Sequence, residues 1–268
     1  MRSQERKAPK AESPQSRRRF LKSFSAVAGF TAVASAASKA AAYTRPVWTP
    51  PPTKEPACFL RGTTIRTDDG EVAVESLSIG DLVITQSGAA RPVKWIGRRT
   101  YRSDAGTNWP SHIFPIRVAK SALADNVPSV DLYLSPLHAL YVDGVLIPVK
   151  HLVNGTTIRP AMPEGVEDIE YFHVELDSHD VIIAGGAPAE TYRELDSREI
   201  FSNFAQFYRI YGRAEAPSPA CAPYLHYRGR RDHAKAQLRL GLSRVVDVRD
   251  PIQIVRDRLA DRGALVAI

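Results

Sequence analysis

The chain has 268 residues, of which 44% are hydrophobic, so it is long enough to bury the core of one main domain with appendages. Residues 1–42 contain nine of the 36 basic residues and two of the 29 acidic residues, which leaves 27 of each in residues 43–268. The body of the chain is therefore neutral, although the formal net charge of the whole is +7. The positive net charge therefore gives no indication of a polyanionic partner, and we expect no nucleic acid as partner.

The N-terminal segment has the order of regions found in export signals. Residues 16–22 read SRRRFLK, which resembles the twin-arginine motif, with Arg17 and Arg18 as the paired arginines. The alanine-rich run at 23–38 is too short and too weakly apolar for a stable membrane span, and the small residues after it suit a signal peptidase. We expect a signal peptide at 1–42, with the twin-arginine translocase as partner during export and a final location in the periplasm or outside the cell. The alternative is a basic amphipathic helix lying on a surface.

A proline-rich segment follows the expected signal. Residues 43–57 read YTRPVWTPPPTKEPA and contain five prolines. Each proline fixes φ and removes a backbone donor, so we expect an extended linker rather than part of a core. The linker ends at Cys58.

From residue 58 to residue 192 the chain consists of short runs rich in β-branched residues, separated by turn sequences. Asp143 and Gly144 form a two-residue turn sequence that is typical of a tight hairpin. No helix-length apolar periodicity interrupts this region, so we expect an all-β domain. The expected strands are 63–67, 71–77, 81–86, 91–96, 139–142, 145–149, 169–176 and 181–184.

Residues 193–268 differ from the β region in their sequence pattern, which predicts a C-terminal extension that is mainly helix and loop. Apolar residues recur at helical spacing over 196–211, which predicts one helix there. Asp250 followed by Pro251 predicts the start of a short helix that runs through residue 262. The stretch 217–232 is expected to be a loop.

Three patterns in the β region carry candidate catalytic side chains. The first is CFLRGT at 58–63 with VESLSIGDLV at 74–83, the second is SPLHALYV at 135–142, and the third is YFHVEL at 171–176 followed by HDVIIA at 179–184. In this order and at these spacings they resemble the Hint family, the shared fold of inteins and of the Hedgehog autoprocessing domain, in its stand-alone bacterial branch. The resemblance implies a Hint-type β fold.

The resemblance also implies a chemical role for each matched side chain. Cys58 would attack the carbonyl of Ala57 in an N-to-S acyl shift, which exchanges the peptide bond for a thioester. His138 would protonate the departing amine, because histidine titrates near neutrality. Ser135, at a position that usually holds threonine, would donate to the developing oxyanion or hold the scissile peptide.

The sequence departs from splicing inteins at the end of the third pattern. An intein ends in His-Asn, whereas residues 188–192 read PAETY and contain no asparagine, which excludes splicing. Where many family members have an acid, this chain has His173, so His173 and His179 are both candidates for a second acid or base. We expect autocatalytic, single-turnover cleavage between residues 57 and 58 rather than turnover of an external substrate.

Three alternatives remain beside this interpretation. Cys58 and Cys221 are the two cysteines of an expected export product, so a structural disulfide is a rival to a free nucleophile. If Cys58 is free and activated by His138, it should be alkylated faster than Cys221 near pH 7. The domain could also be a catalytically inert envelope binding module, or a cysteine hydrolase that acts on other proteins. We expect no cofactor and no metal, because the sequence has no His-Glu-x-x-His, no Cys-x-x-Cys and no phosphate-binding glycine loop.

Overall fold

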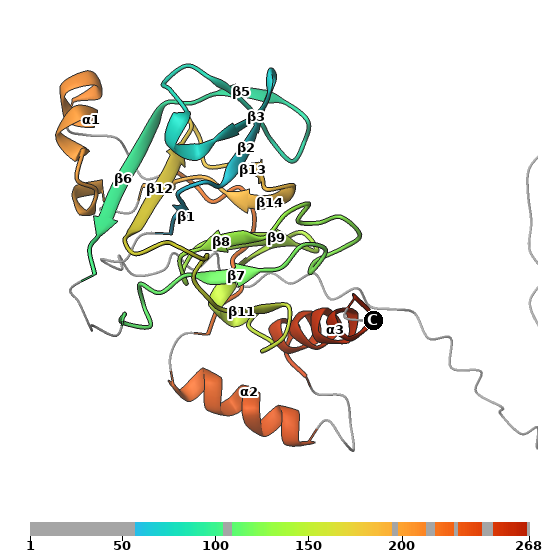
Figure 1. The fold of residues 1–268 in the computed structure, drawn as a ribbon. Helices are drawn as coiled ribbons and strands as arrows, with labels where there is room; N and C mark the ends of the chain where they lie inside the picture. The colour runs from blue at the N-terminus through green and yellow to red at the C-terminus, as the bar shows by residue number, and fades with distance from the viewer. Residues whose placement is uncertain are drawn as a thin grey trace, which may run out of the picture. The chain divides into compact units, whose positions relative to one another are not determined.

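Two antiparallel β-sheets form the body of the structure, a computed structural model (Figure 1). It describes residues 57–103, 109–194, 198–212, 218–227, 230–242 and 249–266. The expected signal peptide and all but the last residue of the expected linker lie outside these residues. The prediction of an all-β domain followed by a mainly helical extension is confirmed.

Sheet A has six strands among the described residues and holds the start of the β domain at its centre. The two-residue strand β1 lies between β8 and β12, with Phe59 opposite Leu134 on one side and Phe172 on the other. In spatial order the strands are β11 (Ile158–Pro160), β7 (Ile116–Val118), β8 (Leu132–Leu134), β1 (Phe59–Leu60), β12 (Ile169–Glu175) and β6 (Trp95–Tyr101).

Sheet B has eight strands among the described residues. In spatial order they are β10 (Val145–Pro148), β9 (Ala139–Val142), β14 (Ala187–Glu190), β13 (Val181–Ala184), β2 (Thr64–Thr67), β4 (Leu82–Ile84) and β5 (Ala90–Pro92), while β3 (Gly70–Ala73) pairs with β2. The predicted hairpin joins β9 and β10. Asp143 and Gly144 have φ values of 52° and 83°, the left-handed pair that a type I′ turn requires.

The two sheets contribute to one shared core. Phe59 and Phe172 of sheet A and Leu140 and Ile182 of sheet B belong to the same buried cluster and are at most 5% exposed. A second cluster, which contains Cys58, covers the opposite side chains of β12. Both faces of β12 are therefore covered, and this explains why six of its seven residues are buried instead of alternating.

Two strand predictions were wrong in detail. The predicted strand 71–77 ends at Ala73 and continues as a 3₁₀ turn, η1 (Val74–Ser76). The predicted strand 91–96 is two strands, because the chain leaves sheet B after β5 and enters sheet A at Trp95. Backbone bonds from Val93 to Asp81 and from Gly80 to Val93 fix this crossing.

One further short turn, η2 (Val149–His151), lies in the β domain. The described parts of the extension contain the turn η3 (Arg198–Ile200) and the helices α1 (Phe204–Tyr211), α2 (Arg230–Leu242) and α3 (Pro251–Val266). The single helix predicted over 196–211 is instead η3 followed by α1, and the predicted loop 217–232 gives way to α2 at Arg230. For α3 the predicted cap is present: the Gln253 amide donates to Asp250 Oδ1 at 3.0 Å, and the Asp250 amide donates to Gln253 Oε1 at 3.2 Å.

Helix α1 and the turn before it cover sheet A at its β6 edge (Figure 1). Asn203 accepts a bond from the Arg98 backbone and donates one to the Ile96 carbonyl, each at 2.9 Å, so that its side chain replaces a neighbouring strand. Buried Arg198 pairs with Glu175 of β12 at 2.6 Å, and its guanidinium lies 3.5 Å from the ring centroid of Phe207. The extension is therefore anchored to the strand that carries His173.

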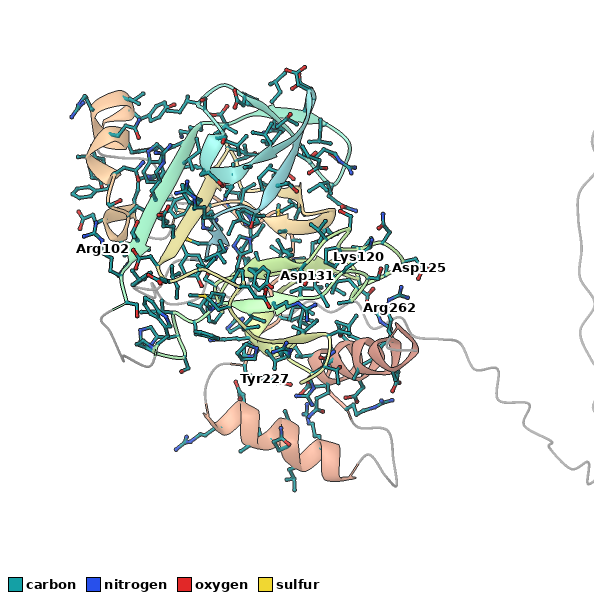
Figure 2. All side chains as sticks on the ribbon, in the orientation of Figure 1. Arg102, Lys120, Asp125, Asp131, Tyr227 and Arg262 are labelled. Atoms are coloured by element: carbon teal, nitrogen blue, oxygen red, sulfur yellow. The ribbon has the colours of Figure 1, made fainter. Side chains whose placement is uncertain are left out.

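Helix α3 packs on the other end of the molecule. Val255 and Leu259 join the shared core. Arg262 bonds to the Ser121 carbonyl at 2.8 Å and pairs with Asp125, beside which it lies in Figure 2. Within the part of the chain that the structure describes, no helix is long and apolar enough to cross a membrane.

Candidate active site

Cys58 is held in place by reciprocal hydrogen bonds with Ser135. The Cys58 amide donates to Ser135 Oγ at 2.7 Å, and the Ser135 amide donates to the Cys58 carbonyl at 2.9 Å. Both residues are buried. The bonded amide nitrogen belongs to the Ala57–Cys58 peptide, so Ser135 contacts that peptide directly.

A tight turn connects Ser135 to His138. The His138 amide donates to the Ser135 carbonyl at 3.0 Å, and the imidazole that follows is 0% exposed. Neither ring nitrogen has a hydrogen-bond partner among the described residues. Burial lowers the pKa of His138 to about 4, while the Glu190 carboxylate and the backbone of Ala57 and Cys58 act in the opposite direction. The ring is therefore neutral at pH 7 and lies beside the backbone of the peptide that Ser135 holds.

His173 of β12 lies against His138. The two rings stack with centroids 5.4 Å apart and an interplanar angle of 25°, and Tyr192 covers the edge of His173 at 5.3 Å. Burial, then the proximity of His138, lowers the pKa of His173 to about 3. Its ring nitrogens also have no hydrogen-bond partner among the described residues. Of the two histidines left open by the sequence, His173 is the one in ring contact with His138.

His179 belongs to a neighbouring buried cluster. Its Nδ1 accepts a bond from the Cys221 amide at 3.0 Å, and its Nε2 faces Glu190 Oε2 at 3.6 Å. Tyr224 donates a hydrogen bond to the same Glu190 oxygen. Burial raises the pKa of the Glu190 carboxyl, but bonds from His179 and Tyr224 and the proximity of His138 outweigh it and lower that pKa overall.

Glu190 connects the two groups of histidines, and the sequence interpretation did not assign it a role. Its Oε1 accepts a bond from the Ala139 amide, one residue after His138, at 2.6 Å. In the sequence, the signal for Glu190 is its place within PAETY at 188–192, the stretch that lacks the asparagine of inteins. Tyr224 had no signal, because it lies in a segment expected to be a loop.

The two cysteines are both free thiols. Cys58 is 0% exposed, and burial raises the pKa of its thiol well above the usual value, against a smaller lowering by Arg99. Cys221 is exposed, and partial desolvation raises its pKa to about 11. These environments favour faster alkylation of Cys221, the opposite of the order expected from the sequence, because a buried thiol with a raised pKa is less reactive than an exposed one.

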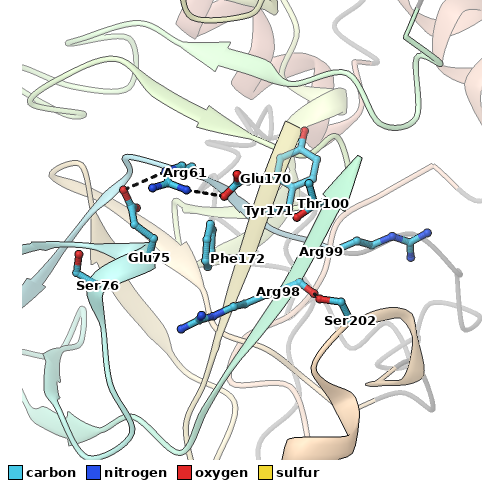
Figure 3. A pocket seen from close by; sticks show the side chains of 10 residues that line it. All are labelled: Arg61, Glu75, Ser76, Arg98, Arg99, Thr100, Glu170, Tyr171, Phe172 and Ser202. Carbon is cyan, nitrogen blue, oxygen red and sulfur yellow. Dashed lines mark hydrogen bonds and ion pairs between the residues drawn. The ribbon is translucent and has the colours of Figure 1, made fainter. Parts of the chain in front are cut away.

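A polar pocket of about 470 Å³ opens on sheet A, apart from these residues (Figure 3). Arg61 spans it with ion pairs to Glu75 at 3.8 Å and Glu170 at 2.8 Å. None of the candidate catalytic side chains lines it. Across the described ranges, no group of three or more His, Cys, Asp or Glu side chains is arranged to hold a metal ion.

Comparison with known proteins places the β domain in a family. The family described as "Hint domain" matches residues 57–196. Structural similarity is found to the gp41-1 intein (11% identity, TM-score 0.35, 50% of this chain and 98% of that one) and to a bacterial intein-like domain from Clostridium thermocellum (15%, 0.37, 52% and 99%). A DnaB intein from Synechocystis sp. PCC 6803 is also similar (9%, 0.35, 51% and 99%). No curated protein matches the chain.

Proposed function

Because the chain belongs to the Hint domain family, we propose that it cleaves itself between Ala57 and Cys58 by an N-to-S acyl shift, without splicing. The observation that carries the proposal is the bond from the Cys58 amide to Ser135 Oγ at 2.7 Å. It fixes the nitrogen that must become the leaving group, and the buried His138 imidazole, whose ring nitrogens have no hydrogen-bond partner among the described residues, lies beside the same backbone.

In the proposed first step, the Cys58 sulfur attacks the Ala57 carbonyl carbon and its proton moves to the neutral imidazole of His138. The carbon–nitrogen bond then breaks, and His138 returns the proton to the nitrogen, which leaves as the α-amine of Cys58. The product is a thioester between Ala57 and the Cys58 sulfur. His138 thus acts first as base and then as acid, and it ends the step unchanged.

The resting protonation states suit this order. Burial raises the pKa of the Cys58 thiol and lowers that of His138, so both groups are neutral before the reaction. A separated thiolate and imidazolium would be costly in a site this buried. We infer that the proton moves as the sulfur–carbon bond forms. The acyl shift should therefore be slow, and an added nucleophile that consumes the thioester should drive it to completion.

Water or a small thiol would then attack the thioester and release the segment that ends at Ala57. A thiol such as dithiothreitol, or hydroxylamine, attacks a thioester far faster than an amide. The purified full-length chain should therefore release this segment on incubation with either reagent, and Cys58→Ala should abolish the release. Cys221→Ser provides the matched control, since it removes the other thiol and should cleave as the wild type does.

The location of the protein is a second part of the proposal. We infer export by the twin-arginine translocase, on the strength of Arg17 and Arg18 within SRRRFLK. Replacing both arginines by lysine keeps the charge but should retain the protein in the cytoplasm. Normal recovery of the double variant from the periplasm would contradict this route.

An inert binding module is the second candidate, and the burial of Cys58 favours it, because a thiol with a raised pKa is a poor nucleophile. The N-terminal residue of the mature protein separates the two. Cleavage by a signal peptidase alone, after Ala42 or after Ala36, gives Tyr43 or Ala37 as the N-terminal residue, whereas self-cleavage gives Cys58. If the folded wild-type chain stays intact through prolonged treatment with hydroxylamine, self-cleavage is contradicted and the inert binding module is favoured.

A further inference from the structure

Residues 218–227 lie outside the matched family region, yet they are bonded to the β domain. Leu146 of β10 donates to the Pro223 carbonyl and accepts from the Leu225 amide, both at 2.9 Å, which forms a parallel bridge at Tyr224. At the start of the segment, Ser218 Oγ accepts a bond from the His179 amide at 3.1 Å. The segment therefore has a fixed register against sheet B.

This register brings two groups of the segment to His179. The Cys221 amide donates to Nδ1 at 3.0 Å, so Nδ1 is the unprotonated nitrogen and the ring proton lies on Nε2, facing Glu190. The ring of Tyr224 stacks on His179, with centroids 6.1 Å apart, and its hydroxyl donates to Glu190 Oε2. The guanidinium of Arg193 covers Tyr224 at 4.9 Å.

Glu190 links His179 and Tyr224 to the candidate active site. Its side chain is 5% exposed, with Oε2 facing His179 and Tyr224 and Oε1 bonded to the Ala139 amide at 2.6 Å. Ala139 follows His138 directly and begins β9. A chain of contacts thus runs from Tyr224 through one carboxylate to the backbone that carries the His138 imidazole.

The charges around His138 give this chain a chemical consequence. Two titratable side chains from other elements act on or adjoin the His138 ring, His173 on β12 and Glu190 on β14, and the backbone of Cys58 acts on it as well. Of these, the carboxylate of Glu190 raises the pKa of His138 against the effect of burial. Tyr224 and His179 in turn lower the pKa of Glu190, which keeps that carboxylate charged.

We propose that Glu190 and Tyr224 are positioning residues for His138, so that the segment 218–227 completes the self-cleavage site of the β domain. Glu190 holds the start of β9 and places a negative charge where the His138 imidazolium forms. Tyr224 orients and stabilises that charge. The inference rests on the proposed function, because it assigns these residues to the same reaction.

The test uses the full-length chain with Tyr224→Phe, which keeps the ring and removes the hydroxyl. Tyr227→Phe is the matched control, because the Tyr227 hydroxyl bonds to Asp250 at 3.2 Å instead of to Glu190. Glu190→Gln removes the charge with little change of shape and provides a second variant if Tyr224→Phe folds poorly. One readout is the rate of dithiothreitol-induced cleavage at neutral pH. The other is the titration of His138 by NMR in a Cys58→Ala background, which does not require cleavage.

Tyr224→Phe and Glu190→Gln should both lower the pKa of His138 and slow cleavage, because a weaker base takes the thiol proton less readily. We expect the cleavage rate to fall about tenfold for each unit by which the pKa of the His138 imidazolium is lowered in the transition state. Tyr227→Phe should change neither readout. The inference would be overturned if His138 titrated in Tyr224→Phe as it does in the wild type. It would also be overturned if the wild type cleaved and Tyr224→Phe cleaved at the same rate. If the wild type does not cleave at all, the proposed function fails, and the titration still decides the coupling.

Discussion

The imidazole of His173 stacks on that of His138, with ring centroids 5.4 Å apart and an angle of 25° between the planes. Two histidines this close cannot both be positively charged imidazolium ions without strong repulsion. Their pKa values, lowered by burial to about 4 for His138 and about 3 for His173, describe a pair that is neutral at pH 7. A proton taken up by His138 during the reaction therefore stays on His138 until the amine receives it.

His138→Ala tests that proton transfer. Removal of the imidazole should slow hydroxylamine-induced cleavage by about 10²–10⁴-fold, the usual contribution of a positioned acid or base. His112→Ala is the control, because His112 is exposed and should not affect the rate. The measurement is the appearance of the Cys58 N-terminus by mass spectrometry. Equal rates for the two variants would remove His138 from the mechanism.

Ser135→Ala tests the bond that holds the scissile peptide. The substitution leaves the buried Cys58 amide without its acceptor, which should lower the free energy of unfolding by about 1–3 kcal/mol. Cleavage should also slow, since the nitrogen is no longer fixed. Ser135→Thr keeps the hydroxyl and should retain both properties. Urea unfolding and cleavage assays on the three proteins check this, and an alanine variant as stable and fast as the threonine variant contradicts it.

Alkylation of the two thiols reports on the burial of Cys58. In the native protein, iodoacetamide should modify exposed Cys221 first and leave Cys58 largely unmodified. In urea, both should react at similar rates because the burial is lost. Peptide mapping by mass spectrometry measures both. Fast native labelling of Cys58 in Cys221→Ser would show that the thiol is accessible, against the structure.

The parts of the fold that the sequence predicted well are those in which local signals agree with tertiary contacts. The strand 181–184 and the hairpin turn at Asp143 and Gly144 are examples, because the turn residues adopt the left-handed conformation that their chemistry favours. The break between β5 and β6 could not be predicted in this way. The run RPVKWI at 91–96 contains no Gly, Asn or Asp that would mark a break, and only the sheet into which each end hydrogen-bonds separates β5 from β6.

The candidate site shows the same division. Cys58, Ser135 and His138 were found because the resemblance fixes their order along the chain. Glu190 and Tyr224 were not assigned, since their contact joins residues 34 positions apart and depends on the register of a loop against β10. Helix α2 was missed for a different reason: its hydrophobic residues form no clear stripe, although alanine, lysine, glutamine and leucine in it favour a helix.

Acid sensitivity offers a test of the histidine pair that is independent of catalysis. The pKa values of about 4 and about 3 lie below the 6.5 of an unburied histidine. Between these values the unfolded chain binds protons that the folded chain does not, so the free energy of unfolding should fall as the pH drops below 6.5 and continue to fall toward pH 4. The combined loss should be on the order of a few kcal/mol.

His173→Leu removes one of the two titrating rings and keeps an apolar side chain against Tyr192 and Phe201. Its free energy of unfolding should therefore depend less steeply on pH than that of the wild type, whatever its absolute value. His112→Leu is the control and should keep the wild-type slope, because His112 is exposed and lies outside the buried stacked pair. Urea unfolding across about pH 4.5 to 7 gives the slopes directly. Identical slopes for wild type and His173→Leu would mean that folding does not lower the pKa of His173, and the neutral stacked pair would have to be abandoned.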